Sequence, residues 1–265
     1  MELSLYIIDA FTEKQFQGNS AAVVPLKEWI EPALMQKIAF ENNLSETAFI
    51  KEVAQNRYEI RWFSPLSEID FCGHTTLAAS HVLFHERGVE GSLTFVTRNV
   101  GELFVVQNAQ DCIEMSFPNQ APTCVHAVPK ALLEGLSLPP LEVWQNRQAY
   151  VAVYAHEHDI HALTYDSLKL KTLTPLDVVV TAPSQTYDFI SRYFWPANGG
   201  LEDPVTGSIH AGLTPFWAER LQKQTLVAYQ ASQRGGVLYC TLKGDRVLVS
   251  GKGVKYLHGK IFLDV

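Results

Sequence analysis

Cysteine is scarce in this sequence, and its placement excludes two classes of protein. The 265 residues include only four cysteines. They are scattered and form no C-x-x-C pair, so neither a zinc cage nor a disulfide framework is indicated. A reducing compartment is the simplest setting for such a chain, and we therefore expect a cytoplasmic protein.

Long apolar runs and an excess of positive charge are also missing. No run approaches the roughly 20 apolar residues of a membrane helix, and the first residues lack the basic start and cleavage site of a signal peptide. Lys and Arg number 21 against 28 Asp and Glu, giving a formal net charge of −7. That balance argues against a nucleic-acid surface and against binding to anionic membranes. With 47% hydrophobic residues, the chain is an ordinary globular protein that can bury its own core.

Strand-like and helix-like segments follow one another in an order that occurs twice. Helices are expected over 32–42, with Pro32 at the first position, over 75–86, ending before Gly88, and over 208–221, where Pro215 predicts a kink. A short helix is expected over 186–194. Strands are expected over 3–9, 21–24, 46–51, 57–63, 93–97, 102–107, 112–117, 148–155, 176–181, 224–230, 236–242, 245–250 and 260–264.

Prolines crowd the stretch 118–147, and such segments commonly separate domains. We therefore expect an N-terminal domain over 1–117, completed by the C-terminal strand 256–265. The C-terminal domain is expected over 118–255.

A weak internal repeat precedes the two long helices. Glu68-Ile69-Asp70-Phe71-Cys72-Gly73-His74 aligns without gaps with Glu202-Asp203-Pro204-Val205-Thr206-Gly207-Ser208. The two glycines are separated by about half of the chain. A coincidence of two helix starts is the alternative, but the shared context favours two related halves.

Such helix starts are suited to binding an anion. The first N–H groups of a helix are unpaired and lie at the positive end of its dipole, and glycine lets a ligand approach the backbone. With His74 and Ser208 as added donors beside Gly73 and Gly207, two such ends facing a cleft would bind a small carboxylate or a developing oxyanion. The simpler alternative is that His74 and Ser208 only cap their helices.

Two acidic residues are candidates for proton transfer. Glu46 enters an apolar strand, where burial would raise its pKa as general acid/base catalysis requires. Asp203 lies close to the second helix start. The simpler alternatives are a turn glutamate and an Asx turn. His81 and His85 lie one helical turn apart, but a metal site there lacks a visible third ligand.

Cys72 raises the question of a racemase that uses two thiols. That mechanism needs one thiol on each side of the substrate carbon, and the matching position in the second half is Thr206. Because a hydroxyl is far less acidic than a thiol, the two-thiol mechanism is disfavoured. A mechanism in which Glu46 alone moves the proton stays open.

These segments together resemble the PhzF-like phenazine biosynthesis family of isomerases. The matching segments are Asp9-Ala10-Phe11 with Gly18-Asn19, Asn43 to Phe49, Arg61 to Pro65, Glu68 to Ala79, and Glu202 to Ser208. The resemblance runs from residue 1 to about 255 and is loosest over 118–185. Around Gln230 the family's usual glycine-arginine-proline turn is replaced, so the substrate is not identified.

The resemblance implies a diaminopimelate-epimerase-like α+β fold. It has two pseudo-symmetric domains, each a β-barrel-like sheet around a central helix, with the active site between them. It further implies that Glu46 is the catalytic acid/base with His74 and Asp203 flanking the reacting centre. Substrate binding is then expected at the Gly73, Gly207 and Ser208 region, with Cys72 beside it.

The family's named reaction is a proton shift that isomerises trans-2,3-dihydro-3-hydroxyanthranilate without metal or organic cofactor, and its members are often homodimers. We therefore expect a cofactor-independent isomerase that acts on a small carboxylated metabolite. Two alternatives stay open at this point. One is an amino-acid racemase or epimerase that uses Cys72 and another base. The other is a non-catalytic binding protein on the same fold.

Overall fold

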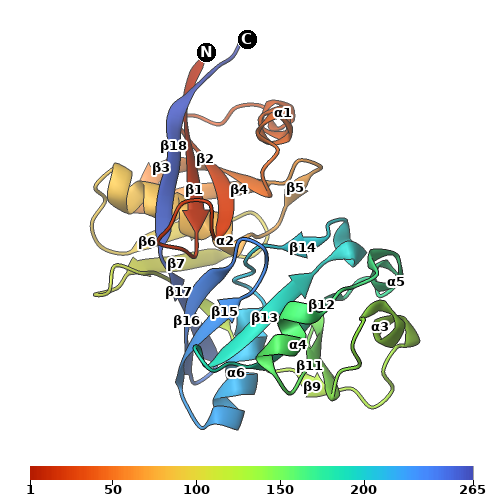
Figure 1. Cartoon of the computed structure of the whole chain (residues 1–265). Helices are drawn as coiled ribbons and strands as arrows, with labels where there is room; N and C mark the ends of the chain where they lie inside the picture. Colours follow the sequence, from red (N-terminus) through yellow and green to blue (C-terminus); the bar gives the residue numbers. More distant parts are fainter. Residues whose placement is uncertain (265) are drawn as a thin grey trace. The chain divides into compact units, whose positions relative to one another are not determined.

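The computed structural model describes residues 1–264, and the chain divides into two compact units. Unit 1 consists of residues 1–116 and the segment from Ser250 onward, and unit 2 consists of residues 117–249. Figure 1 follows the chain from red to blue, and in unit 1 the blue C-terminal strand lies beside the red N-terminal strand. Unit 1 is therefore assembled from two parts of the chain that are distant in sequence.

Unit 1 is built on one run of paired strands with few helices. Its strands are β1 (Glu2–Ala10), β2 (Asn19–Leu26), β3 (Glu46–Ala54), β4 (Arg57–Phe63), β5 (Glu68–Ile69), β6 (Leu93–Val96), β7 (Glu102–Gln107), β8 (Ile113–Pro118) and β18 (Gly253–Phe262). Its helices are α1 (Pro32–Asn42), α2 (Gly73–His81) and a π-helical turn, η1 (Val82–Glu86).

The strand pairing of unit 1 mixes antiparallel and parallel neighbours. β1 pairs antiparallel with β18 and with β2. The two parallel pairs, β2 with β3 and β4 with β6, are those whose connections contain α1 and α2. β3 with β4, β4 with β5, β6 with β7 and β7 with β8 are antiparallel. Parallel neighbours need such a crossover, which explains where the two helices occur.

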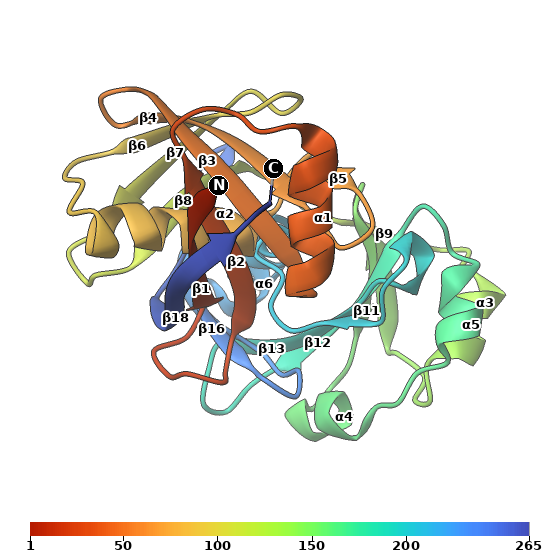
Figure 2. The ribbon, with the colours of Figure 1, turned by 90° about the horizontal axis from the view of Figure 1, so that it is seen from above.

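Strand β3 shows how the two faces of this sheet are used. Phe49 belongs to an apolar cluster with Met35 and Ile38 of α1. Because successive side chains point to opposite faces, Glu46 and Ala48 point away from α1. That face is covered by α2, which contacts β1, β2 and β3. Figure 2 shows α1 along the outside of these strands.

Helix α2 is the central helix of unit 1, and all nine of its residues are buried. Small side chains allow the strands to surround it. The hydroxyls of Thr76 and Ser80 donate to backbone carbonyls one turn earlier, at 2.6 and 2.8 Å, so their burial leaves no donor unpaired. The expected helix over 75–86 starts earlier, at Gly73, and its last turn is the π-helical η1. Gly88 then takes a positive φ of 65°, as a residue that ends a helix often does.

Unit 2 contains more short helices than the sequence indicated. Its strands are β9 (Thr123–Cys124), β10 (Glu142–Gln145), β11 (Ala149–Val153), β12 (Asp177–Pro183), β13 (Phe189–Phe194), β14 (Glu202–Asp203), β15 (Thr225–Gln230), β16 (Gly236–Lys243) and β17 (Arg246–Gly251). Its helices are α3 (Lys130–Gly135), α4 (Glu157–Ala162), α5 (Ser167–Lys171), the 3-10 turn η2 (Pro196–Asn198) and α6 (His210–Leu221).

The pairing in unit 2 repeats that of unit 1. β10 and β11 are antiparallel, β11 and β12 parallel, and β12 and β13 antiparallel. β13 then pairs with the short β14 and, in parallel, with β15 across α6, and β15 pairs antiparallel with β16. The order of antiparallel and parallel pairings is therefore the same as the order found for β1 to β7 in unit 1. The repeat inferred from two heptapeptides therefore extends to the topology of both units.

Two expected elements are wrong in type or extent. Residues 186–194 do not form a helix, because Phe189–Phe194 is β13, a strand with partners on both sides. A short apolar run of this kind cannot be assigned by periodicity alone, and its aromatic residues favour a strand. The last strand starts at Gly253 instead of residue 260, since it pairs along the whole of β1.

Helix α6 contains a proline, and the carbonyl that this proline leaves unpaired accepts a hydrogen bond from another segment of unit 2. Pro215 lacks the N–H that would bond to the carbonyl of Ala211. That carbonyl accepts instead from the backbone N–H of Gln120, at 3.0 Å. Gly212 makes room for this approach, because a Cβ there would lie 3.0 Å from the Gln120 carbonyl oxygen and 2.5 Å from Asn146 Nδ2.

A bidentate ion pair ties the segment before each long helix to its sheet. In unit 1, Arg61 of β4 donates through Nε and one terminal nitrogen to both oxygens of Glu68, each at 2.7 Å. In unit 2, Arg192 of β13 binds Glu202 in the same way, at 2.8 and 2.9 Å. Each guanidinium also lies over a phenylalanine of its own strand, Phe63 or Phe194.

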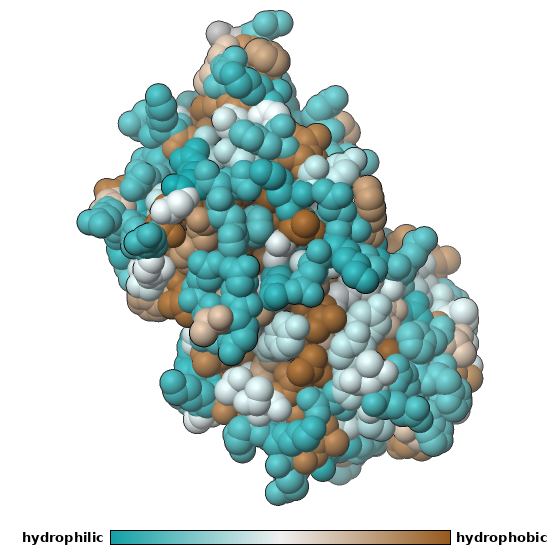
Figure 3. Space-filling model, turned by 60° about the vertical axis from the view of Figure 1, so that its left-hand side comes forward, coloured by the Kyte–Doolittle hydropathy of each residue, from teal (hydrophilic) through white to brown (hydrophobic). Residues whose placement is uncertain are grey.

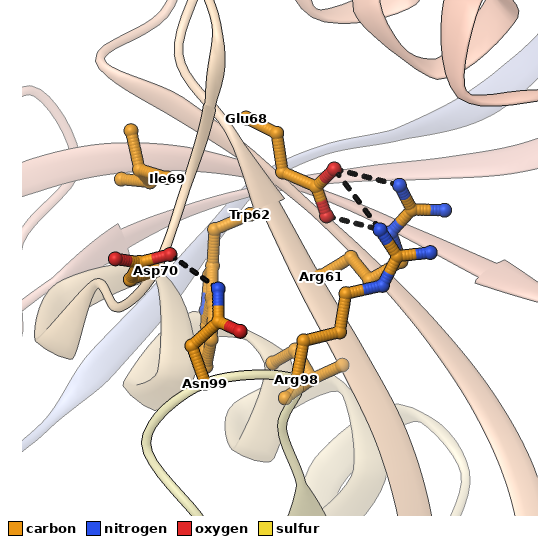
Figure 4. A pocket seen from close by; sticks show the side chains of 8 residues that line it. Arg61, Trp62, Glu68, Ile69, Asp70, Arg98 and Asn99 are labelled. Atoms are coloured by element: carbon orange, nitrogen blue, oxygen red, sulfur yellow. Dashed lines mark hydrogen bonds and ion pairs between the residues drawn. The ribbon is translucent and has the colours of Figure 1, made fainter.

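Figure 4 shows this tie in unit 1 together with its surroundings. The exposed guanidinium of Arg98 reaches the same Glu68 carboxylate at 3.4 Å. Asn99 donates to Asp70 at 2.6 Å, so a second side-chain hydrogen bond holds the segment that leads to α2. These residues line a hollow of about 160 Å³ with Trp62 at its side.

On the face drawn in Figure 3, hydrophilic side chains cover most of the surface and hydrophobic ones stand in small groups. Among residues 1–264, no helix combines the length and the apolar character needed to cross a membrane.

The tie between Arg61 and Glu68 predicts an acid-sensitive stability. The hydrogen bonds from Arg61 hold the pKa of Glu68 below its usual value. Its contribution is therefore complete above about pH 4.5, the ordinary glutamate pKa, and is lost as the pH falls through the lowered one. We expect Glu68→Gln to lower the free energy of unfolding by about 1–3 kcal/mol at pH 7 and by less at pH 3.5, measured by urea denaturation.

A matched control is available in the same unit. Arg57 and Glu102 also join two strands, but their side chains are 40% and 43% exposed, whereas Arg61 is 5% exposed and Glu68 is 31% exposed. Glu102→Gln should therefore change stability little. Equal losses in both variants would contradict the special role of the Arg61 tie.

Candidate active site

Three buried side chains with acid/base or nucleophilic chemistry meet in unit 1. Glu46 starts β3, and Cys72 and His74 flank the first residue of α2. His74 Nε2 lies 3.1 Å from Glu46 Oε2, and the Cys72 thiol donates to the same oxygen at 3.5 Å. Cys72 Sγ also lies 3.3 Å from His74 Nδ1. We call these three residues the buried triad.

The neighbours of the triad hold the imidazole ring in place. Asn19, on the adjacent strand β2, places its amide nitrogen 3.2 Å from His74 Nδ1. Ser45 donates in turn to the Asn19 amide oxygen at 3.3 Å. Asn19 faces α2 because its neighbour two positions on, Ala21, pairs with Glu46 across the parallel strands. The ring is therefore fixed from its Nδ1 side, and Nε2 is left to Glu46.

The electrostatics of the triad raise the pKa of both the thiol and the imidazole. Burial raises the pKa of Cys72, and the Glu46 carboxylate raises it further. Burial acts to lower the pKa of His74, but Cys72 and Glu46 outweigh it and bring it well above its ordinary value. His74 Nε2 and Glu46 Oε2 form an ion pair whose alignment falls short of a good hydrogen bond.

The start of α2 has no side-chain cap, so its first N–H groups have no side-chain acceptor. The ring of His74 is occupied by Asn19, Cys72 and Glu46 and does not serve as a cap. Gly73 adds no side chain that would cover these N–H groups.

The matching loop of unit 2 carries a different set of bonds. The Thr206 hydroxyl donates to the Asp203 carboxylate at 2.5 Å. The buried Gln230 side chain accepts from the Thr206 N–H at 2.9 Å and donates to the Asp203 carbonyl at 2.8 Å. Thr206, the counterpart of Cys72, is thus committed to holding Asp203. Nothing in this loop supplies a second thiol, in agreement with the argument against a two-thiol racemase.

Ser208 also belongs to a bonded chain and does not cap its helix. Its hydroxyl oxygen accepts from Gln148 at 2.9 Å, and Gln148 donates to Tyr193 at 3.0 Å. The Tyr193 hydroxyl donates to Asp177 at 2.7 Å, and burial raises the pKa of both groups. Helix α6 starts only at His210, after a turn that contains Gly207 and Ser208.

The structure groups the predicted residues by unit. It brings Glu46, Cys72 and His74 together with Gly73 in unit 1, and Asp203, Gly207 and Ser208 onto one loop in unit 2. The roles assigned to them stay predictions. Sequence reasoning missed the residues that hold these groups, namely Asn19, Gln148 and Gln230. Gly18-Asn19 was part of a matched motif, but no local pattern shows that its amide reaches a helix far along the chain.

The two histidines considered as a metal site do not form one. The rings of His81 and His85 lie 4.4 Å apart, but among residues 1–264 no third His, Cys, Asp or Glu ligand atom completes a group with them. Within residues 1–264, the buried triad is the one group whose oxygen, sulfur and nitrogen atoms lie close enough together to hold a metal ion, within 4.8 Å of one another.

Comparison with known proteins assigns the family. The sequence model of the phenazine biosynthesis-like protein family matches residues 8–259. This chain belongs to that family. It is 45% identical over 264 residues to a protein of Pseudomonas aeruginosa named as an uncharacterized isomerase, covering 99% of this chain and 100% of the relative. The predicted resemblance, and with it an enzyme of this isomerase family, is confirmed.

Solved structures confirm the predicted fold class. A PhzF-family phenazine biosynthesis protein from Enterococcus faecalis superposes with a TM-score of 0.94 at 40% identity, over 99% of this chain and 100% of that one. A hydroxyproline epimerase from Agrobacterium vitis has a TM-score of 0.64 at 10% identity, over 100% of this chain and 93% of that one. This second likeness shows the fold alone. The α+β fold with a central helix in each half is thus shared with the epimerases.

The geometry around the cysteines predicts an order of thiol reactivity. Cys124 is exposed, whereas Cys72, Cys112 and Cys240 are buried, and burial raises the pKa of Cys240 to about 12. Because the thiolate is the reactive form, iodoacetamide at neutral pH should alkylate Cys124 at least about tenfold faster than Cys72. Peptide mass mapping measures both rates, with the urea-unfolded protein as control. A Cys72 as reactive as Cys124 would instead favour a thiolate mechanism.

Proposed function

We propose that this protein is a cofactor-independent isomerase in which Glu46 moves a proton on a small carboxylated substrate. The observation that carries the proposal is the contact of Glu46 with His74 at the uncapped start of the buried helix α2. A carboxylate that must take and return a proton needs a fixed position and a stable partner. Family membership supports the reaction class, since the relatives are named isomerases.

The two oxygens of Glu46 have different surroundings. Both His74 and Cys72 contact Oε2. We assign the proton transfer to Oε1, for which the described residues offer no hydrogen-bond or ion-pair partner. In this scheme Oε1 takes a proton from a substrate carbon, and the electron pair left behind is delocalised into the substrate. The same oxygen then returns the proton to another carbon, so that atoms and charge balance over the cycle.

His74 and the first N–H groups of α2 complete the proposed chemistry. A positive charge on His74, whose pKa lies well above its ordinary value, is proposed to pair with the Glu46 carboxylate. The N–H groups at Gly73 and the helix dipole favour a substrate carboxylate or the charge that develops on it. Asp203, Gly207 and Ser208 are proposed as further substrate-facing residues on the strength of the family motif. A homodimer and a cytoplasmic location stay predictions.

Deuterium wash-in tests the proposal directly. The protein is incubated in D₂O with trans-2,3-dihydro-3-hydroxyanthranilate and, separately, with a pool of carboxylated metabolites, and deuterium at carbon is read by mass spectrometry. We expect label in one carboxylate, and a loss of at least about 100-fold in its rate with Glu46→Gln. Glu52→Gln, an exposed glutamate on the same strand, is the matched control and should keep the full rate.

The remaining alternatives give different results. Label that survives Glu46→Gln but disappears on Cys72→Ser would replace the proposal with a thiol racemase. Ligand-induced thermal stabilisation without label for any compound would favour the binding-protein alternative. Circular dichroism on each variant separates loss of chemistry from loss of fold.

A further inference from the structure

The buried triad has the chemical composition of a transition-metal site. Cysteine sulfur, histidine nitrogen and glutamate oxygen are the three donor types that zinc prefers. The triad offers one of each, within 4.8 Å of one another. We propose that Glu46, Cys72 and His74 bind a zinc ion, and that zinc bound there blocks the isomerase. The second half of this proposal rests on the function proposed above.

Two of the three distances within the triad are close to those of a zinc shell. Tetrahedral ligands at about 2.0–2.3 Å from zinc are about 3.3–3.6 Å apart. The observed separations are 3.5 Å from Cys72 Sγ to Glu46 Oε2 and 3.1 Å from His74 Nε2 to the same oxygen. Cys72 Sγ lies 3.3 Å from His74 Nδ1, so the complete shell needs a side-chain rotation that brings the sulfur toward Nε2.

His74 Nε2 is the nitrogen that lacks a well-aligned partner. The residue is 4% exposed, and its Nε2 has no properly directed hydrogen bond despite its closeness to Glu46. A buried polar atom without a bond is unusual and points to a missing ligand atom. Metal-bound histidines are normally fixed through their other nitrogen. Here Asn19 stands at Nδ1, and a half-turn of its carboxamide lets it accept the Nδ1 proton.

Charge and coordination number also fit. One thiolate and one carboxylate neutralise Zn²⁺, so the buried site would carry no net charge. On binding, the thiol proton and the Nε2 proton leave to solvent, and the Thr75 hydroxyl, 2.9 Å from Cys72 Sγ, can then donate to the thiolate. Three protein ligands leave a fourth position for water, which is typical of an accessible site and not of a structural one.

Zinc is expected to inhibit the proposed isomerase because it would bind the atoms that the reaction needs. The Glu46 carboxylate is the group proposed to carry the substrate proton, and the His74 charge is the one proposed to support it. A zinc ion bound to Glu46 and His74 leaves neither a free carboxylate nor an N–H at Nε2. Zinc is therefore expected as an inhibitor, competing with the carboxylated substrate.

Cobalt substitution tests the site without any substrate. Co²⁺ bound to a thiolate gives an intense charge-transfer band in the near ultraviolet. We expect one Co²⁺ per chain with this band, its displacement by Zn²⁺, and loss of the band in Cys72→Ser. Cys124→Ser, the exposed cysteine, is the matched control and should keep it. Glu46→Gln and His74→Ala should weaken zinc binding at least about tenfold. No band, or a band that survives Cys72→Ser, overturns the site.

A measurement on the unaltered protein covers the case in which these variants do not fold. X-ray absorption at the zinc edge should show one sulfur neighbour at about 2.3 Å and otherwise nitrogen or oxygen. A first shell without sulfur would overturn the site. It would place zinc elsewhere, for example at the surface histidines His156, His158 and His161, and a His158→Ala, His161→Ala variant would show that directly by losing the zinc.

The exchange assay separates the two proposals. If label appears and zinc abolishes it over the concentration range in which cobalt binding saturates, both stand. If zinc binds through Cys72 but leaves Glu46-dependent exchange intact, inhibition is wrong. If zinc binds and no compound is labelled, the metal site stands and the proposed isomerase fails for those substrates.

Discussion

The bidentate pairing of an arginine with a glutamate is the interaction on which the rest of each unit depends. Arg61 and Arg192 lie on the strand before the parallel crossover, and Glu68 and Glu202 stand on the short strand that leads to the long helix. The fork geometry fixes direction as well as distance. Each short strand is only two residues long, so its backbone pairing alone would hold it weakly. These ion pairs therefore fix the position of the helix starts that carry the candidate site.

The two halves have kept this scaffold while their helix starts have taken on different chemistry. In unit 1 the residue before the glycine is Cys72, buried with an imidazole and a carboxylate. In unit 2 the same position is Thr206, whose hydroxyl holds Asp203 while Gln230 fastens the loop from behind. A thiol with a raised pKa and a hydroxyl already donating are both poor bases. This contrast is one reason for proposing Glu46 as the group that moves the proton.

Sequence reasoning reached the repeat and the members of the triad because these depend on local patterns, and it reached the fold class through the family resemblance. It could not reach the contacts that hold them. Arg61 and Arg192 were not aligned because the segment between arginine and glutamate is longer in the second half, and a gap-free comparison cannot bridge it. Asn19 and Gln230 act through long-range bonds that leave no periodicity. The helix expected over 186–194 failed for the opposite reason: a local pattern fitted either state, and the flanking strands β12 and β15 decided it.

The carbonyl of Ala211 has a bearing on how unit 2 folds. This carbonyl accepts a hydrogen bond from the backbone N–H of Gln120, which lies far earlier in the chain and outside the helix. Helix α6 therefore cannot satisfy its own backbone as an isolated segment, and its completion waits for the stretch around residue 120 to dock. A buried helix that depends on a hydrogen bond from a distant segment is a poor early folding nucleus. Its completion marks a late step of folding. Amide hydrogens of Gln120 and of the α6 residues around Ala211 should accordingly open together, as members of one cooperative unit.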